Sequence, residues 1–201
     1  MKDTIYSVDN IDFNNIEIKQ PIKTADNNYQ SKINIYIQTP KLQITKINDK
    51  SISLCLNDDT INLLDKFDNF LIEKISEKSN EFFDNEITKD EFEEIYKSSY
   101  HKNKMTLKYS EQLNIYSSSK KNLKIEDLVE NNEIIAIINC SKIIYYKTYC
   151  FPYWEIEQIK LKKKKEDKVK LNHSSYLFLE DHGEPKNTEE EIKLKSLEFK
   201  K

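Results

Sequence analysis

The chain is almost without glycine and entirely without arginine. Gly183 is the single glycine among 201 residues, and all 32 basic residues are lysines. Loops that bind nucleotide phosphates need several residues without a Cβ, because backbone amides must approach the phosphates closely. A glycine-rich phosphate loop is therefore excluded, and with it nucleotide hydrolysis of the P-loop type.

Cysteines and long apolar runs are also scarce. Cys55, Cys140 and Cys150 form an odd set without close pairs, so free reduced thiols are expected. No segment approaches the roughly 20 apolar residues of a membrane helix, and the N-terminal residues lack a basic region followed by an apolar stretch. We therefore expect a soluble intracellular protein without a membrane partner.

Patterns that would indicate catalysis or metal binding are missing as well. His101, His173 and His182 lie in polar contexts without the spacing of zinc ligands. No serine or cysteine lies on a glycine-flanked turn of the kind that presents a nucleophile. The many carboxylates of residues 57–96 lie opposite apolar helix faces, where a solvated surface is expected. We predict no catalytic residue, no metal and no cofactor, and hence a protein that is not an enzyme.

Charge is divided into blocks along the chain. Residues 57–96 hold 13 acidic residues against 4 lysines, a net −9, whereas residues 97–124 hold 7 lysines against 1 glutamate, a net +6. Residues 141–175 hold 9 lysines against 4 acidic residues, a net +5. Such blocks allow one basic face on a protein whose formal net charge is only −3. Ordinary solvated faces explain the same pattern.

Three short strands are expected within residues 32–56, where apolar residues alternate in "KINIYIQT", "KLQITKI" and "SISLCL". Pro40 has no amide donor and closes the first strand, so "QTP" is interpreted as a corner. Helical spacing follows at Ile61, Leu64, Phe67, Leu71 and Ile75, after the capping candidates Asp58 and Asp59.

A second helix is predicted from Thr88, because Thr88 and Glu91 form a capping box and Ile87 can pack on Phe92. Alternation then returns in "MTLKY", "LNIYS", "EIIAIIN", "IIYYKTY" and "YWEIEQIKLK". The order strands, helices, strands predicts an α+β fold, namely a small, mostly antiparallel β-barrel of the oligonucleotide-binding type with a helical insert at about 58–99. A small sandwich is the alternative.

One β-rich domain is predicted over residues 1–182, with "SYLFLE" as a candidate last strand. Residues 183–201 begin with the chain breakers Gly183 and Pro185, and continue with Thr188 and Glu191 as a second capping box. We interpret them as a C-terminal tail that holds a short helix outside the core.

Aromatic residues and lysines alternate on the late strands. In "KIIYYKTYC", a simple alternation places Tyr145, Lys147 and Tyr149 on one side of a strand, and Tyr146 on the other. Single-stranded nucleic acid is bound by this mixture, because bases stack on rings while lysines contact phosphates. A core position for the rings is the competing interpretation, above all for Trp154. The candidate binding residues are Tyr145, Lys147, Tyr149, Trp154, Lys160 and Lys162.

Two segments carry a family resemblance, "IYIQTPKLQI" and "IIAIINCSKIIYYKTYCFPYWEIEQIKLK", which flank the helical insert. Across about residues 16–162 the chain resembles the single-stranded-DNA-binding proteins of nucleo-cytoplasmic large DNA viruses, which are similar to the small phage type with an acidic tail. The resemblance implies an oligonucleotide-binding fold, no catalysis, and tail contacts with replication proteins. The tail departs from that pattern, since it interleaves lysines and ends in Lys200 and Lys201.

The hypothesis from sequence is therefore a non-catalytic single-stranded-DNA-binding protein acting in viral DNA replication, repair or recombination. The expected location is the host cytoplasm or viral factory, with virion incorporation and homodimer formation left open. A structural or interaction protein, such as a minor virion component, is the alternative, because aromatic residues are also enriched at protein interfaces.

Overall fold

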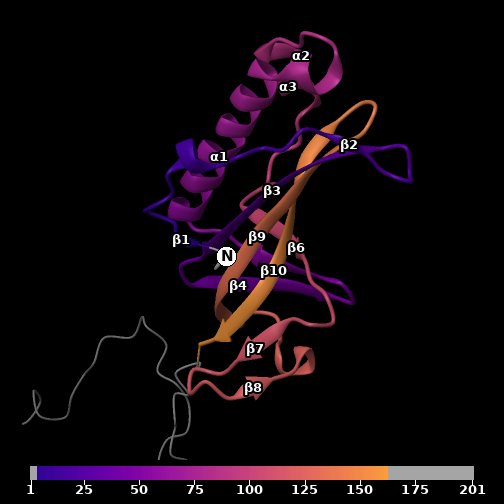
Figure 1. Ribbon diagram of the computed structural model, residues 1–201. Helices are drawn as coiled ribbons and strands as arrows, with labels where there is room; N and C mark the ends of the chain where they lie inside the picture. Colours follow the sequence, from indigo (N-terminus) through magenta and orange to yellow (C-terminus); the bar gives the residue numbers. More distant parts are fainter. Residues whose placement is uncertain (1–3, 163–201) are drawn as a thin grey trace, which may run out of the picture. The chain divides into compact units, whose positions relative to one another are not determined.

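The computed structural model describes residues 4–162, which belong to the first of two compact units, residues 1–165. This part of the chain contains ten strands, three α-helices and two short 3-10 helices (Figure 1). The expected tail at 183–201 and the candidate strand "SYLFLE" lie outside the described residues.

Five strands close into a barrel: β4 (Leu42–Asn48), β5 (Ser51–Cys55), β6 (Lys104–Lys108), β9 (Glu133–Tyr145) and β10 (Cys150–Leu161). Around the barrel the order is β4-β5-β6-β10-β9, and β9 pairs with β4 again. Every neighbouring pair is antiparallel except β6 with β10, which is parallel. The predicted α+β fold with a barrel of the oligonucleotide-binding type is confirmed, and the sandwich alternative was wrong.

The corner predicted at "QTP" lies between two strands that pair in succession with β9. β3 (Tyr29–Gln38) pairs with β9 up to Gln38 opposite Ile137, and β4 resumes with Leu42 opposite Ile134. Between them, two hydrogen bonds join Thr39 to Ala136 of β9. The Thr39 amide donates to the Ala136 carbonyl at 2.8 Å, and the Thr39 hydroxyl accepts from the Ala136 amide at 3.0 Å. Pro40 therefore follows a firmly bonded residue at the bend.

Replacing Pro40 by alanine is expected to lower the free energy of unfolding by about 0.4–1 kcal/mol. The substitution frees the unfolded chain at this position, whereas the Thr39 hydrogen bonds stay in place in the folded protein. Urea unfolding followed by circular dichroism would measure the change. Oligonucleotide affinity should stay the same, so a folded P40A protein with much weaker binding would contradict a purely structural corner.

The remaining strands extend the sheet at its edges. β1 (Ile5–Ser7) lies parallel to β3, and β2 (Ile22–Lys23) pairs antiparallel with it. At the other edge β7 (Asn114–Tyr116) lies parallel to β10, and β8 (Asn122–Leu123) pairs with β7. The 3-10 helices η1 (Phe13–Asn15) and η2 (Ile125–Asp127) lie in the connecting segments. Two expected strands, "EIIAIIN" and "IIYYKTY", are instead mostly one, because β9 runs unbroken from Glu133 to Tyr145.

Three helices fill the segment between β5 and β6: α1 (Asp58–Glu77), α2 (Ser79–Phe83) and α3 (Lys89–Ile95). The predicted capping box of α3 is confirmed, since the Glu91 amide donates to the Thr88 hydroxyl and the Thr88 amide donates to the Glu91 carboxylate. The predicted cap of α1 was wrong by one residue. Asn57 has the extended backbone of a cap and accepts from the Thr60 amide at 3.1 Å.

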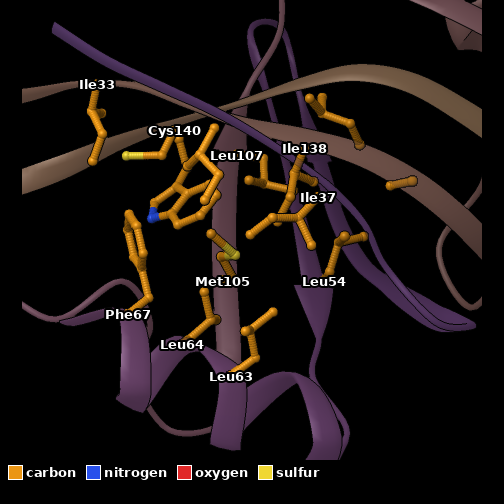
Figure 2. Packing of buried hydrophobic residues seen from close by; sticks show 14 of the residues in the cluster. Ile33, Ile37, Leu54, Leu63, Leu64, Phe67, Met105, Leu107, Ile138 and Cys140 are labelled. Carbon is orange, nitrogen blue, oxygen red and sulfur yellow. The ribbon is translucent and has the colours of Figure 1, made fainter. Parts of the chain in front are cut away.

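Helix α1 packs its apolar face on the barrel (Figure 2), where Leu63, Leu64 and Phe67 point towards the barrel residues. Trp154 of β10 lies in this core, with 5% of its surface exposed. Its ring meets Phe67 edge-on at a centroid distance of 5.2 Å. The helix thus covers the barrel and buries the single tryptophan of the chain.

A buried carboxylate joins α1 to the segment that leads into β6. Asp68 accepts hydrogen bonds from the Tyr96 and Ser98 hydroxyls and from both the amide and the hydroxyl of Ser99. The Ser99 hydroxyl also accepts from the Trp154 indole at 3.0 Å. Burial raises the pKa of Asp68, while these hydrogen bonds, those of Ser99 first, oppose the shift. The network satisfies the polar atoms that the helix brings into the core.

Candidate nucleic-acid interface

The tip of the β9–β10 hairpin lies beside α2 and α3 (Figure 1), and helical residues cover one side of it. On this inner side Tyr145 meets Phe83 of α2 edge-on at 5.3 Å. Tyr96, just after α3, forms an isolated bridge with Cys150 at the start of β10. Residues on the other, outer side of the hairpin alternate with these covered residues and point away from them.

A two-residue loop decides which tyrosines share a side. The Tyr146 amide donates to the Tyr149 carbonyl at 2.8 Å, so the chain reverses at Lys147 and Thr148. Tyr145 then lies opposite Cys150, and Tyr146 lies next to Tyr149. The expectation that Tyr145 and Tyr149 share one face was wrong, because alternation was counted through a chain reversal.

Three aromatic rings stack on the outer side of this hairpin. The Tyr146 and Tyr149 rings lie 4.7 Å apart at an interplanar angle of 23°, and the Phe151 ring lies 6.1 Å from each. Tyr146 is 38% exposed and Tyr149 is 36% exposed. Rings that stack on each other also offer faces and edges to a further planar group.

Lysines lie near the stacked rings. Lys142 places its ammonium 4.7 Å from the centroid of the Tyr153 ring, in a cation–π contact. Lys32 of β3 lies opposite Lys142 in the sheet register, and Lys147 is exposed in the hairpin loop. We call this set the hairpin surface; it consists of Tyr146, Tyr149, Phe151, Tyr153, Lys32, Lys142 and Lys147.

The hairpin surface continues towards the outer face of β6. Glu155 follows Tyr153 on the outer side of β10, accepts a hydrogen bond from the Ser141 hydroxyl at 2.6 Å, and lies opposite Lys108. On β6, Lys104, Thr106 and Lys108 are exposed, while Met105 and Leu107 between them are buried. A second group of lysines therefore lies on the barrel strand next to β10.

The residues predicted from sequence separate into three groups. Tyr149 and Lys147 lie together in the hairpin surface. Lys160, which is exposed, and Lys162 lie at the far end of β10, where Lys160 pairs with Ile135 and the Lys162 amide donates to Glu133. The structure does not bring these two lysines to the hairpin tip.

Tyr145 and Trp154 form the third group and are corrections, because both are core residues. Tyr145 is 7% exposed and its hydroxyl donates to Ser31 at 3.1 Å. Burial raises the pKa of Tyr145 well above its ordinary value. Their rings pack against Phe83 and Phe67, respectively, so neither belongs to the outer side of the hairpin.

Sequence reasoning missed Tyr146, Phe151, Tyr153, Lys32 and Lys142. A hairpin would have been recognisable only from the two long apolar runs on either side of "KT", since the loop contains no Asn-Gly or Asp-Gly pair. With that turn assumed, pairing Tyr146 with Tyr149 brings Phe151 and Tyr153 onto the same side.

No helix within residues 4–162 is both long and apolar enough to cross a membrane. In the same residues no group of three or more histidine, cysteine or acidic side chains is arranged to hold a metal ion. His173 and His182 lie outside this part of the chain. The prediction that the protein needs no metal or cofactor stays a prediction.

A family model matches residues 40–180, which include the whole barrel. The chain belongs to the DUF5871 family, described as a family of unknown function. No curated protein matches it in sequence.

Among solved structures, similar chains include three of the single-stranded DNA-binding protein from bacteriophage Enc34. The chain described by that name alone is 12% identical, with a TM-score of 0.41, and the match covers 79% of this chain and 98% of that one. A C-terminal truncation of that protein is 9% identical, with a TM-score of 0.40, and the match covers 76% of this chain and 98% of that one. The chain in complex with single-stranded DNA is 12% identical, with a TM-score of 0.38, and the match covers 74% of this chain and 97% of that one. These likenesses are distant, and the fold assignment rests on the strand order itself.

Proposed function

We propose that this member of the DUF5871 family is a non-catalytic single-stranded-DNA-binding protein whose hairpin surface stacks on bases. The observation that carries the proposal is the stack of Tyr146, Tyr149 and Phe151 beside Lys142 and Lys147. Aromatic rings bind bases without regard to sequence, and lysines follow the phosphates. Both requirements are met within one hairpin.

The distribution of charge also favours the outer side of the hairpin as the side that binds nucleic acid. The charged members of the hairpin surface are lysines, and Glu155 next to it is hydrogen-bonded to Ser141. The helical insert, with its net −9 over residues 57–96, supplies the residues that cover the inner side. A polyanion is therefore attracted to the outer side and repelled from the helices.

The sequence resemblance to proteins of nucleo-cytoplasmic large DNA viruses extends the proposal to viral DNA replication, repair or recombination. A location in the host cytoplasm or viral factory follows from that resemblance. Contacts with replication proteins through residues 183–201 belong to the same proposal and concern residues outside those described.

An interaction protein is the second candidate function. The observation in its favour is that Tyr146 and Tyr149 expose more than a third of their surfaces, as aromatic anchors of protein interfaces do. The interleaved lysines favour a polyanion instead, because charged residues are depleted at the centres of protein interfaces.

Fluorescence anisotropy of a labelled oligonucleotide at several salt concentrations tests the proposal. Binding should weaken steeply as salt rises, because counterions are released from the phosphates on binding. Lys147→Ala should lower affinity at low salt and reduce the slope of log K against log salt by about 0.7, the value for one contact on a single strand.

Lys66→Ala is the matched control for Lys147→Ala, since Lys66 is an exposed lysine of α1 in the acidic block. It should leave both affinity and salt slope unchanged. Equal losses in the two variants, or no binding to any oligonucleotide, would contradict the proposal and favour the interaction protein.

Neutralising the helical insert provides a further prediction. Glu93→Gln together with Glu94→Gln, both exposed on α3, should leave oligonucleotide affinity unchanged or raise it slightly, because two repelling charges are removed. The same anisotropy titration measures the effect. Weaker binding in the folded double variant would mean that the Glu93 and Glu94 carboxylates themselves take part in binding.

A further inference from the structure

A pocket of about 490 Å³ opens on the inner side of the hairpin tip. Its walls come from three places in the sequence: the β2–β3 turn, the α2–α3 segment and the β9–β10 hairpin. Aromatic rings line it, among them Tyr29, Phe83 and Tyr145. This volume lies within the range of about 300–1,000 Å³ that is typical of small-molecule sites.

The polar groups of the pocket are amides and one cation. Asn27 lies in the β2–β3 turn and Asn85 just after α2, and each carries a side-chain amide with two donors and an acceptor. Among the described residues that line the pocket, only Lys147 is charged. Flat apolar walls with neutral donors and acceptors suit a heteroaromatic ring, and a lysine at the hairpin loop suits an attached phosphate.

The pocket is continuous with the hairpin surface through Tyr146 and Lys147, which line it as well. We propose that it holds one nucleobase, taken out of the strand that stacks on the hairpin surface. The inference rests on the proposed function and adds a single-nucleotide site to it. The base would lie among the Tyr29, Phe83 and Tyr145 rings while its phosphate meets Lys147.

A nucleobase suits this pocket better than an apolar side chain of a protein partner. The Asn27 and Asn85 amides match the edges of a base, which present both donors and acceptors. An aliphatic side chain could form no hydrogen bond with these amides, which are exposed in the free protein. Because amides distinguish donor from acceptor edges, the four bases should differ in affinity at this site.

Two-dimensional ¹H–¹⁵N spectra of the full chain, titrated with each of the four deoxynucleoside monophosphates, test the inference. The side-chain amide signals of Asn27 and Asn85 should shift saturably and to different extents for the four bases. Tyr29→Ala should weaken mononucleotide binding about fivefold or more. Tyr29 is 44% exposed, so its removal should leave the fold intact, as the melting temperature will show.

Tyr149→Ala is the matched control, because Tyr149 stacks in the hairpin surface and does not line the pocket. It should weaken oligonucleotide binding and leave mononucleotide binding unchanged. If the oligonucleotide binds but mononucleotides do not shift the two amides, or if Tyr29→Ala binds both like the unaltered chain, the pocket inference is wrong and the proposed function stands.

Two other outcomes also decide the matter. If N-acetyltryptophanamide shifts the Asn27 and Asn85 signals and no nucleotide does, the pocket receives a protein side chain and the inference is wrong. If mononucleotides bind the pocket but no oligonucleotide binds the protein, the base site is real, and the proposed function as a single-stranded-DNA-binding protein is the part that fails.

Discussion

Replacing Trp154 by alanine is expected to lower the free energy of unfolding by about 3–5 kcal/mol, the range for removing a large aromatic ring from a core. The ring packs edge-on against Phe67 and is 5% exposed. Its loss also leaves the Ser99 hydroxyl without its indole donor, beside the buried Asp68. Urea unfolding should be followed by far-ultraviolet circular dichroism, because the substitution removes the chain's single tryptophan.

Trp154→Phe is the control that separates stability from binding. It keeps a six-membered aromatic ring and loses the five-membered part of the indole with its N–H donor, so the cost should be about 1–2 kcal/mol, less than for alanine. This variant should fold and bind an oligonucleotide as the unaltered chain does. A stable W154F protein with a tenfold loss of affinity would return Trp154 to the binding site that the sequence suggested.

The barrel could be predicted from sequence because its strands and helices have strong local signals. Alternation marks β3, β4 and β5, Pro40 marks the bend, and the Thr88–Glu91 pair marks the start of α3. Each of these signals depends on neighbours within a few residues. The barrel closes where β9 pairs with β4, and the paired residues lie about 90 positions apart. In the sequence, only the order of strands, helices and strands indicated this closure.

The faces of the last two strands could not be predicted in the same way. Alternation assigns a side only while the strand is continuous, and the loop at Lys147 and Thr148 reverses that assignment for every later residue. Two further irregularities, between Tyr153 and Trp154 and between Ile156 and Gln158, shift the register again. If every second residue from Tyr145 to Lys162 is assigned to one face, that face therefore contains both core and surface residues.

The buried carboxylate had a recognisable signal that sequence reasoning passed over. Asp68 follows Leu64 by four residues and precedes Leu71 by three, so it lies on the apolar face of α1. A charged residue at such a position needs hydrogen-bond partners, and "KSSY" after α3 supplies them through Ser98 and Ser99. The partners lie about 30 residues away, which is why pattern alone did not identify them.

Tyr146→Ala and Tyr149→Ala are each expected to weaken oligonucleotide binding by about 1–3 kcal/mol, the range for losing one base–ring stack. Both rings are more than a third exposed, so the melting temperature should change little. Their rings lie 4.7 Å apart, so the double variant should lose less affinity than the sum of the single losses. Anisotropy titrations and thermal unfolding of the same samples measure both quantities.

Tyr145→Ala completes this comparison, because Tyr145 is the adjacent residue on the covered side of the hairpin. Truncating it should destabilise the fold by about 3–5 kcal/mol, as for other buried aromatic rings, since it removes the contact with Phe83 and the hydrogen bond to Ser31. Tyr145→Phe keeps the ring, loses only the hydroxyl, and should preserve both the fold and strand binding. The opposite pattern, in which Tyr146→Ala unfolds the protein while a stable Y145F protein loses binding, would show that the outer side of the hairpin is not the side that meets the strand.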